Sequence, residues 1–179
     1  MSVTATPIER DLAQASKFRL NFSRLPDLTF FCKTATLPGV LKTEVRIETP
    51  FVALYAPGDK IEYAALDVTF LVDVDYQTWF SIYDWIAGLT FPKNFDQYKN
   101  LRFQQRSELE SQIRKSFNQY SDGSLTIYTN KNNPNIRINF RELFPVALGS
   151  IDFDVEKSAE EPITCSASFK FTFYDVERL

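Results

Sequence analysis

The chain has 179 residues, of which 44% are hydrophobic, and 20 basic side chains against 23 acidic ones give a net charge of −3. This composition is typical of one globular domain with an ample core and excludes a disordered chain. Proteins that grip nucleic acid through its phosphates carry a basic excess, so tight binding to DNA or RNA is not expected.

Other function classes are disfavoured by what the sequence lacks. No apolar run approaches the roughly 20 residues that span a bilayer, and residues 1–6 lack the basic and apolar regions of a signal peptide. We therefore expect no membrane association and a protein made and used on the cytosolic side. Histidine is absent, which removes the commonest general base and transition-metal ligand. Cys32 and Cys165 lie far apart in apolar runs and are expected to be buried thiols.

The first elements read as a polar arm followed by two strands. Residues 1–16 form the expected N-terminal arm, and residues 17–179 the single domain. Residues 17–24 alternate apolar and polar side chains, residues 25–27 suggest a turn, and residues 28–36 suggest a second strand. We predict that these two strands pair as a hairpin.

A long hairpin is predicted over residues 44–74. Two β-rich runs flank the turn-forming sequence Ala56–Lys60, in which Pro presets one turn dihedral and Gly supplies a positive φ. With about 3.3 Å per residue, each arm would reach on the order of 40 Å. Such a hairpin would protrude beyond a domain of this size.

The outer part of this hairpin is the predicted interface. From Phe51 to Tyr55 apolar side chains fall on both faces, and Pro50 removes a ladder donor just before them. Either another chain or this chain's own insertions must cover such a ribbon. The candidate interface residues are Phe51, Val52, Ala53, Leu54, Tyr55, Pro57 and Gly58.

One helix is predicted over residues 76–89, with Asp75 as N-cap and Gly88 as its stop. The main apolar stripe consists of Tyr76, Trp79, Phe80, Tyr83, Ile86 and Ala87. Ile82 and Trp85 add apolar surface off this stripe. We therefore expect Trp79 and Trp85 to serve in packing against a sheet and in contact with a neighbour.

The remaining chain holds an insertion and four more strands. Residues 94–122 are irregular, with a short amphipathic segment at 108–117 whose basic side chains are interpreted as a solvated face. The β pattern returns after it, with a turn predicted at Glu142–Pro145. The four strands are residues 124–129, 135–140, 148–155 and 163–174. The fold class is therefore mainly β, an antiparallel sandwich or barrel with one flanking helix and the protruding hairpin.

No constellation for catalysis or cofactor binding stands out. Asp73, Asp75 and Asp84 supply oxygen ligands, but carboxylates at a strand end and a helix start are ordinary, so no metal site is predicted. Five glycines leave no phosphate-binding loop, and a serine triad is impossible without histidine. Glu160 and Glu161 are expected to be solvated in a loop. An enzyme is unsupported, and no cofactor is expected.

The order of these pieces resembles the tail tube protein family of contractile-tailed bacteriophages. The resemblance covers residues 17–174 and rests on a hairpin ending in Phe31–Gly39, the long hairpin after it, Asp84-Trp85 in the helix, the Phe144-Pro145 turn and the aromatic last strand. The combination in this order carries the resemblance, since each motif alone is short.

The resemblance implies a structural virion protein that assembles into stacked hexameric rings. The hollow tube would be a conduit through which double-stranded DNA passes without tight binding, and weak like-charge repulsion suits that role. Residues 45–72 would reach the adjacent ring, and residues 94–122 would face a sheath or baseplate protein. The expected location is the phage tail, assembled in the host cytoplasm.

Three functions remain open from the sequence. The first is the repeating tube subunit, and the second is a related protein at an end of the tail, either a baseplate tube initiator or a tail terminator. A carbohydrate-binding β-sandwich is a more distant alternative, because aromatic side chains can form a sugar platform. Trp79 and Trp85 are predicted in a helix, whereas a platform would present them from strands or loops.

Overall fold

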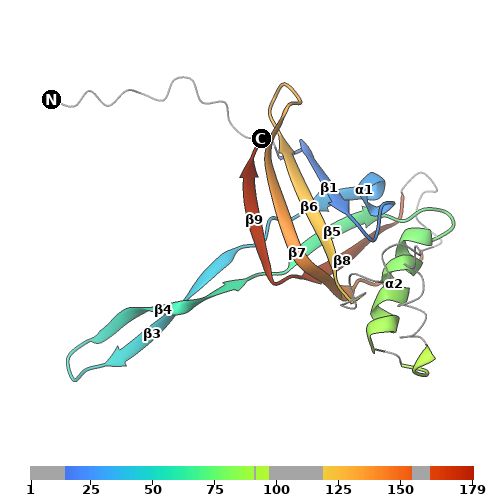
Figure 1. The fold of residues 1–179 in the computed structure, drawn as a ribbon. Helices are drawn as coiled ribbons and strands as arrows, with labels where there is room; N and C mark the ends of the chain where they lie inside the picture. The colour runs from blue at the N-terminus through green and yellow to red at the C-terminus, as the bar shows by residue number, and fades with distance from the viewer. Residues whose placement is uncertain (1–14, 91, 97–118, 155–161) are drawn as a thin grey trace, which may run out of the picture.

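The computed structural model describes residues 15–90, 92–96, 119–154 and 162–179 (Figure 1). Its elements are β1 (Phe18–Phe22), α1 (Leu28–Phe31), β2 (Cys32–Ala35), β3 (Val40–Glu48), β4 (Ala53–Tyr63), β5 (Leu66–Leu71), α2 (Gln77–Thr90), β6 (Ser121–Tyr128), β7 (Pro134–Leu148), β8 (Thr164–Lys170) and β9 (Phe173–Arg178). Most of the N-terminal arm, most of the predicted insertion, and Glu160 with Glu161 lie outside the described residues.

The strands form an antiparallel sandwich connected through one long strand. The 15-residue β7 pairs through its first half with β6 and β9, and through its second half with β8. Two four-stranded layers result, β1-β6-β7-β9 and β7-β8-β5-β2, and among the described strands β3 pairs with β4 alone. The prediction of a mainly β, antiparallel sandwich with a protruding hairpin is confirmed.

The core lies between the two layers. Alternate residues of each strand turn inward, so Leu20 and Phe22 of β1 are buried, and the rings of Phe22 and Phe169 of β8 lie 4.9 Å apart. The largest fully buried side chains are Trp85, Phe22, Phe70, Phe140, Phe169, Leu20, Leu28, Leu66, Ile82, Leu143, Val68 and Thr78. Both layers and α2 contribute to this set, so the helix closes the sandwich.

Helix α2 is present where it was predicted, but its cap and its buried face differ. The carboxylate of Asp73, and not of Asp75, accepts hydrogen bonds from the amides of Gln77 and Thr78 at 3.2 and 3.3 Å. The helix continues through Gly88 to Thr90. The buried side is the one that carries Ile82 and Trp85, which lay off the predicted stripe.

The expected N-terminal hairpin is wrong. β1 pairs with β6 and β2 pairs with β5, so the two segments belong to different layers. Leu28–Phe31 is a helical turn because the amides of Leu28 and Thr29 donate to the carbonyls of Leu25 and Pro26. A four-residue apolar run has too little length for its period to distinguish a strand from a helix.

The C-terminal strands also have different ends from those predicted. The chain does not turn at Glu142–Pro145. β7 runs on to Leu148, with a positive φ of 56° at Glu142 and a register shift after Pro145, which let the strand change layers. Gly149–Asp154, expected to be strand, is not. The last predicted strand is divided into β8 and β9 by a bend at Phe171–Thr172.

Candidate assembly surface

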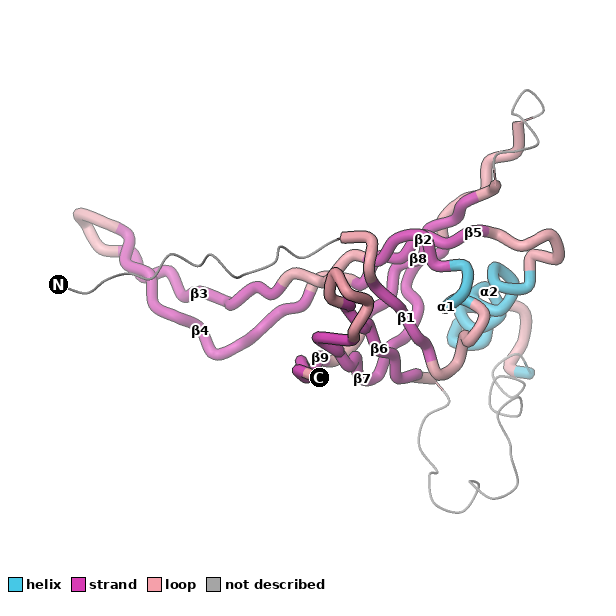
Figure 2. The backbone as a smooth tube through the Cα atoms, turned by 90° about the horizontal axis from the view of Figure 1, so that it is seen from above, coloured by secondary structure: helices cyan, strands magenta, loops and turns pink. Residues whose placement is uncertain are grey.

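The most prominent feature of the fold is the ribbon, defined here as β3, β4 and the turn Thr49–Val52 between them. It projects from the sandwich as a two-stranded arm (Figures 1 and 2). Glu48 pairs with Ala53, so the predicted turn at Ala56–Lys60 is wrong. Residues from Leu66 onward, predicted as the second arm, form β5 inside the sandwich.

The Pro-Gly-Asp sequence forms a bulge in the middle of β4. Lys42 pairs with Ile61 and Glu44 pairs with Pro57, which leaves three residues of β4 opposite Thr43 alone. The Thr43 hydroxyl donates to the carbonyl of Lys60 at 3.2 Å and accepts from its amide at 3.3 Å, and so replaces bonds of the ladder. Figure 2 shows that β4 bows away from β3 along part of its length.

Gly58 is required for this close approach of the strands. A Cβ at residue 58 would lie 2.4 Å from the Thr43 hydroxyl oxygen and 2.7 Å from the Thr43 carbonyl oxygen. Gly58 is buried although it lies in the ribbon. It is therefore a structural residue of the ribbon and not a free contact residue.

The outer half of the ribbon has one apolar face and one polar face. Because paired residues of antiparallel strands share a face and neighbours alternate, the pairs Ile47–Leu54 and Val45–Ala56 lie together. The opposite face carries Glu44, Arg46, Glu48, Ala53, Tyr55 and Pro57, and Arg46 Nε lies 2.6 Å from a Glu48 carboxylate oxygen. Val45, Ile47 and Leu54 are each about half exposed. We call Val45, Ile47, Leu54 and Ala56 the apolar face.

The tip adds an exposed aromatic ring to this surface. The Thr49 hydroxyl accepts a hydrogen bond from the amide of Val52 at 3.2 Å, which closes the turn and holds Pro50 and Phe51 outward. Phe51 is 98% exposed. An exposed aromatic side chain at the end of a protruding arm is typical of a contact site for another molecule.

The base of the ribbon is fixed to the sandwich by aromatic packing. The Tyr63 ring lies 5.5 Å from the Phe171 ring and 5.1 Å from the Tyr174 ring. The Lys170 ammonium also donates to the Tyr63 carbonyl at 3.4 Å. These contacts fix the end of β4 beside the bend between β8 and β9, so the ribbon leaves the sandwich at a defined place.

The predicted interface residues are thus distributed over the ribbon. Phe51 and Val52 lie in the tip, Leu54 lies on the apolar face, and Ala53, Tyr55 and Pro57 lie on the polar face. The interface residues predicted from the sequence did not include Val45 and Ile47, which lie on the apolar face of the ribbon. Their alternation with charged residues was the signal that could have placed Val45 and Ile47 on one face of the strand.

The two tryptophans lie in different environments. Trp85 is buried, donates its indole N–H to the Gln119 carbonyl at 3.1 Å, and stacks beneath the Arg24 guanidinium at 4.7 Å. Burial lowers the pKa of Arg24 to about 10. Trp79 is half-buried and stacks on Tyr83 with ring centroids 5.3 Å apart. The helix thus buries Trp85 fully, while Trp79 packs against the rim of the core with its indole nitrogen buried, and Tyr83 is the exposed member of the stacked pair.

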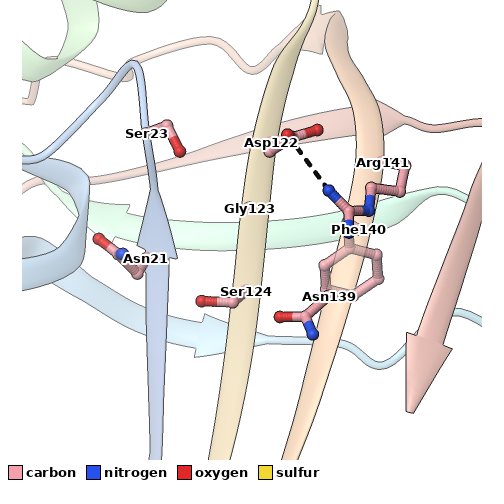
Figure 3. Close-up of a pocket in the computed structure, with 8 residues that line it drawn as sticks. All are labelled: Asn21, Ser23, Asp122, Gly123, Ser124, Asn139, Phe140 and Arg141. Carbon is pink, nitrogen blue, oxygen red and sulfur yellow. Dashed lines mark ion pairs between the residues drawn. The ribbon is translucent and has the colours of Figure 1, made fainter. Parts of the chain in front are cut away.

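The pocket drawn in Figure 3 is polar and lies across the outer face of β1, β6 and β7. Its volume is about 280 Å³, and its lining includes Asn21, Ser124 and Asn139, which are register neighbours. Arg141 lies 3.6 Å from the Asp122 carboxylate at one end. These groups offer hydrogen bonds, but the lining holds no nucleophile with an adjacent base.

The two cysteines are free thiols, Cys165 buried and Cys32 half-buried. Burial raises the pKa of Cys32 to about 11 and also raises that of Cys165, so both thiols stay protonated at neutral pH. Among the described residues, no three potential ligands gather into a metal site. In the same part of the chain, no helix is long and apolar enough to span a membrane.

Comparison with known proteins identifies the family. The family described as phage tail tube protein matches residues 3–177. The chain belongs to the phage tail tube protein family. Membership places it among the structural components of phage tails, so its location is the virion tail, as the sequence predicted.

The chain also resembles a curated phage protein in sequence. The chain is 24% identical over 125 residues to the tail tube terminator protein of Enterobacteria phage T4, a match covering 68% of the chain and 61% of that protein. The chain therefore spans about three fifths of the length of the curated relative that it matches.

Solved structures with the same fold come from contractile injection systems. The tube-terminating cap of the anti-feeding prophage has a TM-score of 0.64 at 13% identity, with 100% of both chains covered. A chain of the baseplate of the same particle scores 0.61 at 8% identity, covering 94% and 97%. A sheath/tube terminator of an extracellular contractile injection system scores 0.57 at 10% identity, covering 95% and 99%. At these identities the likeness shows the fold alone.

Proposed function

We propose that this tail tube family protein forms a ring at the end of the tail tube and terminates it. The observation that carries the proposal is the sequence match to the phage T4 tail tube terminator. It favours the end-of-tail role over the repeating tube subunit that was the first expectation from the sequence. The tube-terminating cap, as a full-length structural match, is in keeping with the proposal.

In this proposal the ribbon binds the last ring of the tube. Its apolar face and Phe51 together present apolar surface that the described residues of the chain leave uncovered. Burying apolar area is worth roughly 25 cal/mol per Å², and a ring repeats the contact once per subunit. The polar face, with its Arg46–Glu48 pair, remains suited to contact with water.

The ring is proposed to hold six copies around a channel for DNA. A net charge of −3 disfavours tight binding of a polyanion, as a conduit requires. Because chains of similar fold belong to a sheath/tube terminator and a baseplate, we extend the proposal to contact with the tube and the sheath. Members of this family are structural proteins, and no catalytic role is proposed for this chain.

The deciding experiment measures tail tubes by electron microscopy after removal of this protein from the phage or injection system that encodes it. A terminator is expected to be dispensable for tube formation, so tubes should form with altered or unregulated lengths and an uncapped end. The added wild-type chain, labelled with gold, should then decorate one end of each tube.

Two results would contradict the proposal. Complete loss of tubes in the deletion, together with assembly of the purified chain into long tubes, would identify the repeating subunit. Label at the baseplate end would identify the initiator.

A further inference from the structure

Three exposed apolar side chains lie at the end of the sandwich opposite the ribbon. Phe30 belongs to α1, Val74 lies between β5 and α2, and Phe153 follows β7. Their side chains are 76%, 94% and 74% exposed, in that order. Single exposed apolar residues are ordinary on a protein surface, but three at one end indicate a contact surface.

Phe30 and Val74 lie at the same end of one layer. Cys32, two residues after Phe30, pairs with Phe70 near the end of β5, and Val74 follows Leu71, the last residue of β5, by three positions. The ribbon is attached at the other end of this layer, because it directly precedes β5 in the chain. Figure 1 shows the ribbon and the connection from β5 to α2 on opposite sides of the sandwich.

Phe153 belongs to the same end. The Gly149 amide donates to the Ser166 carbonyl, and because β7 is antiparallel to β8, the chain after Gly149 runs toward the start of β8. On the other side of β8, the Val72 amide donates to the Ile163 carbonyl. Phe153 and the connection from β5 to α2 therefore lie on either side of the chain that enters β8.

Aspartates accompany all three apolar side chains. The sequence is Asp-Val-Asp at residues 73–75 and Asp-Phe-Asp at residues 152–154, and Asp27 directly precedes α1. These stretches, together with α1, contain five aspartates and no basic residue, and we call them the acidic end. Such a surface attracts an apolar segment that carries positive charge, and it repels DNA and anionic membranes.

One stretch of the chain has the complementary composition. Residues 97–118, which lie outside the described residues, contain five basic and two acidic side chains. Within this stretch Leu109, Ile113 and Phe117 recur at every fourth residue. The ribbon, by contrast, holds three basic residues against four acidic ones, so the ribbon of another copy does not complement the acidic end.

The two points between which this stretch runs allow it to reach the acidic end. It begins shortly after α2 ends at Thr90, and it stops before Gln119, whose carbonyl accepts the Trp85 indole N–H at 3.1 Å. α2 starts just after residues 73–75, and its 14 residues span about 21 Å at roughly 1.5 Å per residue. A stretch of 22 residues can extend and return over about 36 Å, which exceeds the length of the helix.

We propose that residues 97–118 bind the acidic end of their own chain, with basic side chains against the aspartates and apolar side chains against the three exposed apolar residues. Along this path they pass α2, on which Phe80 and Tyr83 are about half exposed. An acidic end occupied in this way leaves no open surface there for a further component of the tail. The contact goes beyond the proposed function and does not depend on it, since it forms within one chain.

Carbodiimide cross-linking of the purified wild-type chain tests the inference. The reagent joins a carboxylate to a lysine amine as an amide, with loss of water and without a spacer, so it reports direct contact. Mass spectrometry should identify links from Lys99 or Lys115 to Asp75 or Asp152. In a mixture of chains made with ordinary and with heavy nitrogen, each link should join peptides of the same isotope, because both belong to one copy.

Arg114→Glu tests the role of charge, because it weakens the attraction while both lysines remain available for the reaction. We expect at least fivefold fewer links in this variant. Lys131→Glu, in the turn between β6 and β7, is the matched control, since it changes the net charge by the same amount and should leave the yield unchanged. Circular dichroism should show the wild-type fold in both variants.

Three results would overturn the inference. Links of mixed isotope composition would place the stretch on a neighbouring copy, and absence of links to these aspartates would assign the acidic end to a partner outside the chain. Equal yields from Arg114→Glu and Lys131→Glu would show that charge does not hold the contact. The position of the ring in the tail is decided separately, by the labelled chain on tubes.

Discussion

At the scale of single residues, Gly58 shows how one side chain shapes the ribbon. The close approach of Thr43 leaves no room for a Cβ, although the backbone of Gly58 has no positive φ. The requirement is therefore one of space and not of conformation. A substitution there acts on the ribbon, which lies outside the core.

We expect Gly58→Ala to loosen the ribbon without unfolding the sandwich. Overpacking costs about 1–3 kcal/mol, so amides of β3 and β4 should exchange with solvent at least fivefold faster. The midpoint of thermal unfolding should stay close to that of the wild type. Gly39→Ala is the matched control, since nothing lies within 4 Å of the position that its Cβ would take. Equal exchange rates in the two variants would show that the bulge is not tight.

Residue patterns also explain what the sequence could and could not predict. The alternation of Cys165, Ala167 and Phe169 predicted a strand correctly, because only a half-buried strand has that period. The same logic failed at Pro57-Gly58, because a turn and a bulge use the same residue types. No local pattern shows which of the two the chain will form when the pairing register is set elsewhere.

Helix α2 shows that the local sequence pattern also does not predict which face of a helix is buried. Aromatic and aliphatic residues surround the helix almost completely, so its period predicted a helix but not the side that meets the sandwich. Tertiary packing selects Ile82 and Trp85, and it leaves Phe80 and Tyr83 half exposed. The candidate interface could not be completed from the sequence for a similar reason. Val45 and Ile47 share a face with Leu54 and Ala56 only because of the pairing between β3 and β4.

At the scale of elements, the two faces of the ribbon predict opposite effects for adjacent residues. Leu54→Asp places a charge on the apolar face and should abolish attachment to tubes, because an unpaired charge is costly to bury. Tyr55→Asp, one residue further on the polar face, should change attachment by less than about twofold. Both side chains are more than half exposed, so both variants should fold.

The measurement is co-sedimentation of each variant with purified tubes, with rings checked by electron microscopy. Equal loss of attachment in both variants would indicate that the ribbon contacts the tube through both of its faces. Full attachment of Leu54→Asp would refute the docking role of the apolar face.

At the scale of the whole molecule, the two proposed assembly surfaces are separate parts of the fold. Ring formation is assigned to the sandwich, and attachment to the tube is assigned to the ribbon. The ribbon leaves the sandwich where Val40 pairs with Tyr63, and the Ala64 amide donates to the Gly39 carbonyl at 3.0 Å just beside this pair. The ribbon can therefore be removed at its base without cutting a strand of the sandwich.

Replacement of residues 41–62 by Asn-Gly should separate the two functions. Val40 and Tyr63 are already paired, and a two-residue Asn-Gly turn is the favoured connection between antiparallel strands. We expect the shortened chain to keep the thermal stability of the sandwich, because the large buried side chains all lie outside the deleted residues. It should still form rings by analytical ultracentrifugation, and these rings should neither bind tubes nor limit their length. If the folded chain without its ribbon formed no rings, the ribbon would have to join neighbouring subunits within one ring. That result would contradict the assignment of ring formation to the sandwich.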